Sequence, residues 1–132
     1  MKRMTTILIS IMYFHLLIAP PNGAGVIFVE EGICPYEPLI KAVVTVESNN
    51  GRYLFNSDEG AVGWFQIRQI RVDHYNQLRG ANYKLTDFYD YDLSREMFLY
   101  YCKGRDFETV AKEWNGSGPM TKDYWRKIQK HL

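Results

Sequence analysis

Hydrophobic side chains recur at helical spacing along most of this 132-residue chain, which predicts a mainly α-helical protein. The clearest apolar stripe covers residues 39–46. Pro35 and Pro38 are expected to open this helix, since proline is tolerated in a first turn, and the helix continues to about Ser48. Glu47 interrupts the stripe near its end, so its carboxyl group is expected to lie among apolar side chains.

Two physical effects are expected to favour the protonated form of Glu47. Burial against apolar neighbours disfavours its charged form, and the negative end of the helix dipole does the same if the helix stops at residues 49–51, which read Asn-Asn-Gly. A carboxylic acid that stays neutral at about pH 6 can protonate the leaving oxygen of a glycosidic bond as that bond breaks. Glu47 is therefore the first candidate catalytic residue.

Turn-forming residues divide the rest of the chain. Residues 49–63 are rich in asparagine, aspartate and glycine and are predicted to form a loop or an irregular hairpin. The predicted fold class is therefore mainly α, or α+β, with a short irregular or β-like insertion after the first helix. Four further helices are predicted: residues 70–78 before Gly80, a helix from an N-cap at Asp92 to Gly104, one from an N-cap at Asp106 through Trp114, and one from Thr121 onward with Asp123 in its first turn.

The N-terminal segment has the pattern of a secretory signal peptide. A basic start, with Lys2 and Arg3, precedes an apolar run over residues 5–19 and a cluster of proline and glycine residues. The run is shorter than the roughly 20 residues that span a bilayer, so no stable membrane anchor is expected. We expect residues 1–24 to be the signal peptide of an exported protein, periplasmic or extracellular, and residues 25–132 to form one domain.

The charge balance and the histidines exclude several function classes. The chain has 16 basic and 15 acidic residues, and loss of the leader leaves 14 basic ones against the same 15. A near-neutral chain without a basic patch predicts no nucleic-acid partner. His15, His74 and His131 have no metal-ligand spacing, so neither a metal site nor another cofactor is expected.

The two cysteines, Cys34 and Cys102, leave two alternatives open. An even pair in an exported chain is compatible with a disulfide between the start and the middle of the domain. The other alternative is a pair of free thiols, because a sequence does not give the separation that a disulfide requires.

Three short segments, which follow one another in the sequence, indicate a function together with Glu47. They are Glu47-Ser48, then residues 60–67 with the sequence Gly-Ala-Val-Gly-Trp-Phe-Gln-Ile, then residues 111–116 with the sequence Ala-Lys-Glu-Trp-Asn-Gly. Their order and spacing resemble the lysozyme-like lytic transglycosylase family, of the soluble lytic transglycosylase and goose-type lysozyme kind. The resemblance implies a lysozyme-like fold and cleavage of the bond between N-acetylmuramic acid and N-acetylglucosamine in peptidoglycan, with Glu47 as the acid that then becomes the base.

The resemblance also implies a set of substrate-binding residues, each with a structural alternative. Ser48 could instead terminate the helix, and the tryptophans could instead fill the core. Trp114 departs from the family, because a tyrosine that contacts the catalytic acid is usual there. The substrate-binding residues that the resemblance implies are Ser48, Gly63, Trp64, Gln66, Trp114 and Asn115.

The mechanism depends on whether a second carboxylate assists Glu47. Asp58, Glu59, Asp73 and Asp92 are candidates, and the sequence marks none of them above the others. Without one, the acetamido oxygen of the substrate can assist, and a lytic transglycosylase forms a 1,6-anhydro ring. We expect this non-hydrolytic outcome; the alternatives are a hydrolytic muramidase and a catalytically silent protein that binds peptidoglycan strands, and either an enzyme or a binding protein could serve a wall-spanning apparatus.

Overall fold

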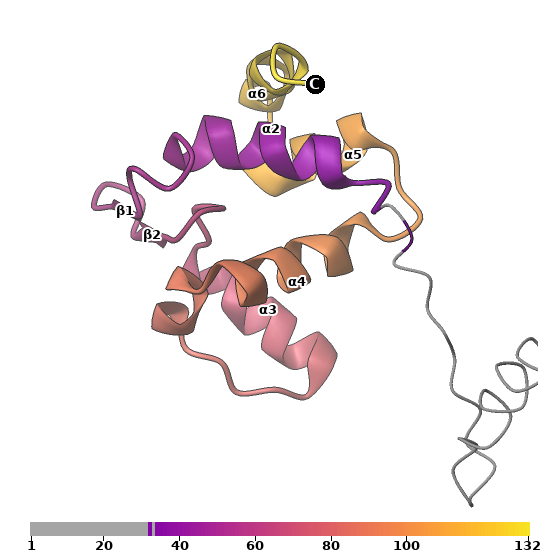
Figure 1. Ribbon diagram of the computed structural model, residues 1–132. Coiled ribbons are helices and arrows are strands. Elements are labelled where there is room, and N and C mark those ends of the chain that lie inside the picture. Colours follow the sequence, from indigo (N-terminus) through magenta and orange to yellow (C-terminus); the bar gives the residue numbers. More distant parts are fainter. Residues whose placement is uncertain (1–31, 33) are drawn as a thin grey trace, which may run out of the picture. The chain divides into compact units, whose positions relative to one another are not determined.

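The computed structural model describes residue 32 and residues 34–132, so the predicted signal peptide and the segment 25–31 lie outside the described residues. The described part is mainly helical, as predicted, with one small antiparallel sheet (Figure 1). No helix within it is both long and apolar enough to cross a membrane. Its elements are α2 (Glu37–Ser48), β1 (Phe55–Asn56), β2 (Ala61–Val62), α3 (Gln69–Arg79), the 3-10 helix η1 (Leu85–Tyr89), α4 (Tyr91–Cys102), α5 (Phe107–Asn115) and α6 (Met120–Gln129).

Local capping explains most of the helix ends. The C-caps of α2 and α3, Asn49 and Gly80, both adopt the left-handed conformation that stops a helix. Asp106 caps α5 as predicted, with its carboxylate accepting a hydrogen bond from the backbone N–H of Thr109 at 2.9 Å.

The predicted N-cap of α4 was wrong by two residues. Asp90, not Asp92, caps this helix: its carboxylate accepts a hydrogen bond from the backbone N–H of Leu93 at 2.8 Å. Asp92 lies instead in the first helical turn, where its negative charge still favours the helix dipole. The preceding 3-10 helix η1 was not predicted, because a five-residue turn carries too little periodicity to be recognised.

The predicted hairpin follows α2 directly. Strands β1 and β2 pair in antiparallel register, with Phe55 opposite Val62 and Asn56 opposite Ala61. An isolated bridge between Val62 and Ile67 then turns the chain back toward α3. This hairpin lies at the C-terminal end of α2 (Figure 1).

The hydrophobic core forms around α2. Helix α6 packs against α2 and α5, and α5 also contacts α4 (Figure 1). The apolar stripe predicted in α2 is buried, and it belongs to one hydrophobic cluster with side chains from every other helix of the described part. Since α2 is fixed on its apolar face, the position of Glu47 in its last turn is fixed as well. The largest fully buried side chains are Tyr75, Phe65, Phe88, Phe98, Leu39, Ile40, Ile67, Met97 and Ile128.

Both cysteines are free thiols in the structure, which is the second of the two alternatives that the sequence left open. Cys102 is completely buried at the end of α4, whereas Cys34 is partly exposed before α2. Burial raises the pKa of the Cys102 thiol to about 12, so this thiol is protonated and unreactive near neutral pH.

Candidate active site

Glu47 lies in the last turn of α2, at the edge of the core. Its carboxylate oxygen Oε1 accepts a hydrogen bond from the phenol of Tyr124 in α6 at 2.6 Å. Desolvation raises the pKa of Glu47 from 4.5 to about 7, against the opposing effect of the Tyr124 hydrogen bond. The acid is therefore substantially protonated near neutral pH, as the apolar stripe predicted.

Charged side chains on the other side of the carboxyl group adjust this pKa. The negative charge of Glu59 raises the pKa of Glu47 further, whereas the positive charges of Arg68 and Arg71 lower it. Each of these charges has a smaller effect on the pKa of Glu47 than burial, which is the largest single effect.

A polar pocket of about 100 Å³ opens onto the carboxyl group of Glu47. It is formed where the end of α2, the hairpin, the start of α3 and the end of α5 converge. Four of the predicted site residues line it together, namely Glu47, Gln66, Trp114 and Asn115. The remaining lining residues are Asn56, Glu59, Arg68 and Arg71.

Tyr124 supplies the phenol that position 114 lacks. Trp114 is almost fully buried, and its indole N–H donates to the backbone carbonyl of Phe65 at 3.1 Å. The acid's hydrogen-bond partner comes instead from α6, so sequence reasoning missed the role of Tyr124. A usable signal was present, because Tyr124 and Ile128 form the buried stripe of α6 at a spacing of four residues.

Ser48 terminates α2 and does not reach the pocket. Its side chain is fully buried. The hydroxyl donates to the carbonyl of Val44 at 3.0 Å and accepts from the backbone N–H of Gly51 at 3.0 Å. Both hydrogen-bonding directions of the hydroxyl are used within the turn, so substrate binding by Ser48, which the resemblance implied, is not supported by its position.

Gly63 and Trp64 shape the hairpin from inside the protein. Gly63 has a φ of +76°, and a Cβ placed there would lie 2.0 Å from the carbonyl oxygen of Phe88. Trp64 packs over Gly51 and meets Tyr91 edge to face, with ring centroids 5.3 Å apart. Neither residue lines this pocket, so both support the hairpin beside it, and their substrate contact stays a prediction.

Gln66 and Asn115 lie at the pocket wall as predicted. The side-chain amide of Gln66 donates to the carbonyls of Tyr53 at 3.0 Å and Gly63 at 2.9 Å, which holds the hairpin in place. Its amide oxygen remains an acceptor that a sugar hydroxyl or N–H group can use. Asn115 ends α5, and its backbone carbonyl accepts from the guanidinium of Arg68 at 3.2 Å.

Two arginines of the pocket were not predicted. Arg71 donates to the backbone carbonyls of Glu113 at 3.2 Å and Trp114 at 2.9 Å, which satisfies the C-terminal end of α5. Its guanidinium also lies 4.1 Å from the centroid of the Trp114 ring. Burial lowers the pKa of Arg71 from its ordinary value. The sequence offered only a weak signal, the spacing of Arg68 and Arg71 by one helical turn.

Comparison of the chain with protein families, with curated proteins and with solved structures finds no match. Among the described residues, no group of three or more histidine, cysteine, aspartate and glutamate side chains could hold a metal ion.

Replacing Tyr124 by phenylalanine is expected to raise the pKa of Glu47 above about 7. The phenol hydrogen bond lowers that pKa in the wild type, and phenylalanine keeps the ring while removing the donor. An NMR titration of the Glu47 carboxyl carbon measures the change. Tyr36→Phe is the control, since its phenol bonds the backbone of Arg105 instead. An unchanged or lowered pKa in Tyr124→Phe would contradict the assignment.

Proposed function

We propose that this protein is an exported lytic transglycosylase of lysozyme-like fold that cleaves the bond between N-acetylmuramic acid and N-acetylglucosamine in peptidoglycan strands. One observation carries the proposal: Glu47 is a carboxylic acid with a pKa of about 7 at the wall of a polar pocket. The arrangement of an acid at the end of a core helix, followed by a hairpin and further helices, supports the fold assignment.

The hydrogen bond from Tyr124 determines which oxygen of Glu47 carries the proton. The pKa of Tyr124 is raised well above its ordinary value by burial and by the nearby Glu47 carboxyl group, so the phenol stays protonated and donates. Because Oε1 accepts this bond, the acid's own proton resides on Oε2. Oε2 is then the atom that delivers the proton to a bound substrate.

In the reaction Glu47 donates one proton to the substrate and then takes one proton back from it. Glu47 Oε2 protonates the glycosidic oxygen as its bond to C1 of the muramic acid breaks, and the substrate's acetamido oxygen supports the positive charge that develops at C1. The Glu47 carboxylate next takes the proton of the C6 hydroxyl, whose oxygen bonds to C1 and closes the 1,6-anhydro ring. No water is consumed, and Glu47 ends the cycle protonated.

Glu59 is the one candidate for a second carboxylate that lines the pocket with Glu47. Its side chain is 59% exposed on the hairpin turn, and it lies 4.0 Å from the guanidinium of Arg68. The other three candidates, Asp58, Asp73 and Asp92, do not line this pocket. We assign Glu59 an electrostatic effect on the pKa of Glu47 and leave proton transfer to Glu47 alone.

Glu59→Gln separates these two roles. The substitution removes a negative charge that raises the pKa of Glu47, so the alkaline limb of the pH profile is expected to move to lower pH. Activity at the optimum should fall by less than about tenfold, because loss of a general base costs roughly 10²-fold or more. The neighbouring exposed Asp58→Asn is the control. A loss of two orders of magnitude in Glu59→Gln would instead indicate a hydrolytic enzyme with two carboxylates.

The alternative of a catalytically silent binding protein loses its main support. The tryptophan at position 114, where the family has a tyrosine, favours that alternative, whereas Tyr124 provides a phenol to the acid from another helix. The decisive experiment adds the purified protein to purified peptidoglycan and follows the fall in turbidity. A protein that sediments with the walls and leaves their turbidity unchanged would have a binding function instead.

A further inference from the structure

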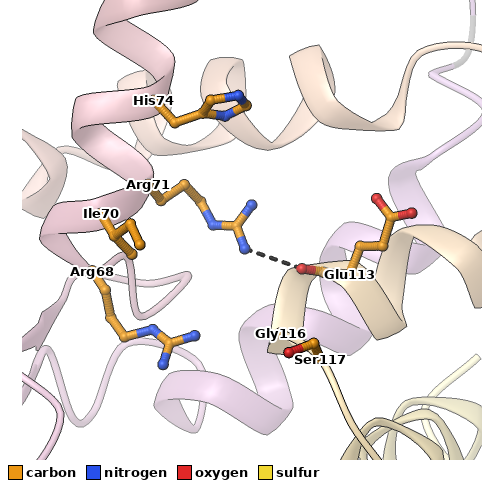
Figure 2. A pocket seen from close by; sticks show the side chains of 7 residues that line it. All are labelled: Arg68, Ile70, Arg71, His74, Glu113, Gly116 and Ser117. Atoms are coloured by element: carbon orange, nitrogen blue, oxygen red, sulfur yellow. Dashed lines mark hydrogen bonds between the residues drawn. The ribbon is translucent and has the colours of Figure 1, made fainter.

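A second pocket, of about 380 Å³, adjoins the pocket of the acid. Two arginines, Arg68 at the start of α3 and Arg71 in its first turn, project toward the end of α5, and His74 lines the same pocket from the next turn of α3 (Figure 2). Arg68 and Arg71 line both pockets. A group bound in the second pocket would therefore lie next to a glycan bond held at Glu47.

Two arginines and one glutamate line this pocket, and Arg68 also lies 4.0 Å from Glu59, which lines the neighbouring pocket of the acid. Glu113 is the only acidic residue that lines it, and its carboxylate pairs with Arg105. Among the described residues, the guanidinium of Arg71 makes hydrogen bonds only through Nη2, to the two carbonyls at the end of α5. Its remaining N–H groups make no hydrogen bond to these residues, and the guanidinium is held in place because it also lies over the ring of Trp114.

A planar anion fits such a pair of guanidinium groups. Arginine recognises carboxylate and phosphate oxygens with paired, charge-assisted hydrogen bonds, which are about twice as strong as neutral ones. Ile70, which is 75% exposed, adds an apolar contact at the same pocket. The ligand is thus an anionic group carried on a partly apolar chain, close to the glycan backbone.

We propose that this pocket binds a carboxylate of the stem peptide carried by the muramic acid at the cleavage site. The proposal rests on the proposed function and adds a specificity subsite to it. In peptidoglycan the stem peptide places carboxylates and small apolar side chains together beside the muramic acid, which matches the two arginines and Ile70. A glycan phosphate shares the anionic chemistry, and the experiment separates the two sources.

The test compares two substrates made from one preparation of glycan strands. Hydrofluoric acid first removes phosphate-linked polymers, and half of the material is then coupled to methylamine so that its carboxylates become neutral amides. The wild type is expected to cleave the amidated strands with a kcat/KM about tenfold lower than the free carboxylate strands. Arg71→Gln should be about tenfold slower on the carboxylate strands and should not distinguish the two substrates.

Two further variants test whether the loss of activity in Arg71→Gln comes only from a change in the fold. Arg79→Gln, at an exposed arginine further along α3 that pairs with Glu96, should behave as the wild type does. Arg68→Gln replaces Arg71→Gln if the latter fails to fold, because it leaves the bonds from Arg71 to α5 intact. An equal loss on both substrates in the arginine variants overturns the proposal.

Two other results also overturn the subsite, and one concerns the function alone. If the wild type cleaves both substrates equally, the pocket does not bind a carboxylate of the stem peptide. If the hydrofluoric acid step itself lowers kcat/KM about tenfold, the ligand is a phosphate. If the wild type cleaves nothing, the proposed function fails. The subsite is then tested by NMR titration with a soluble muramyl peptide and its methylamide, and equal binding of the two overturns it.

Discussion

Glu47→Gln is expected to abolish peptidoglycan cleavage, with a loss of about 10³-fold or more in kcat. Glutamine has the shape of the acid and can still accept the hydrogen bond of the Tyr124 phenol, but it has no proton to transfer. The release of soluble muropeptides from purified walls measures the loss. Glu108→Gln, at an exposed glutamate of α5 that does not line the pocket, should retain full activity.

The same substitution is expected to stabilise the protein at alkaline pH. The pKa of Glu47 is about 7 in the folded protein and 4.5 for an unperturbed glutamate. Between these values the folded state binds more protons than the unfolded state, so the free energy of unfolding falls as the pH rises. Glutamine removes this dependence and should add roughly 3 kcal/mol above the folded pKa and nothing below the unfolded one.

Urea unfolding of both proteins at an acidic and an alkaline pH measures this difference. A gain in stability together with a loss of activity is what a buried catalytic acid predicts, because its ionised form is held in an unfavourable environment. Equal stability of the two proteins at alkaline pH would contradict the raised pKa of Glu47.

Gly63→Ala is the second large effect, and it should destabilise the fold by roughly 3 kcal/mol or more. The added Cβ would lie 2.0 Å from the carbonyl oxygen of Phe88, in backbone that cannot move without separating the hairpin from η1. The φ of +76° adds the strain of a left-handed alanine. Thermal unfolding measures the loss.

Gly60→Ala is the matched control for this prediction. Gly60 also has a positive φ, of +61°, but a Cβ there meets nothing within 4 Å. Gly60→Ala should therefore lower the free energy of unfolding by only about 1 kcal/mol, which is the cost of the left-handed backbone conformation alone. Equal losses at the two positions would show that the contact with Phe88 contributes nothing.

Much of the fold could be predicted because local rules govern it. The apolar stripe of α2, the cap at Asp106 and the glycine-rich hairpin all depend on residues close in sequence, and the structure has them where predicted. The exceptions were the cap of α4 and the 3-10 helix η1 before it. Asp90 and Asp92 are equally good capping residues, and the choice depends on the unpredicted turn η1 before them.

The site was predictable only in part, because its key contacts join distant segments. The position of Glu47 followed from periodicity within one helix. Its partner Tyr124 comes from 77 residues further along the chain, and the arginines from the start of α3 reach it through tertiary packing. Ser48 and Trp114 were placed by resemblance, and only the structure shows that their polar atoms bond to backbone groups.

Mass spectrometry of peptidoglycan digested with the wild type and with Glu47→Gln tests most directly whether Glu47 is the acid of a transglycosylase. The wild type is predicted to release fragments whose muramic acid ends are 1,6-anhydro rings, lighter by one water than hydrolysis products, and Glu47→Gln to release none. Reducing muramic acid ends alone would contradict the transglycosylase mechanism. Equal release by the two proteins would contradict the central claim that Glu47 is the catalytic acid.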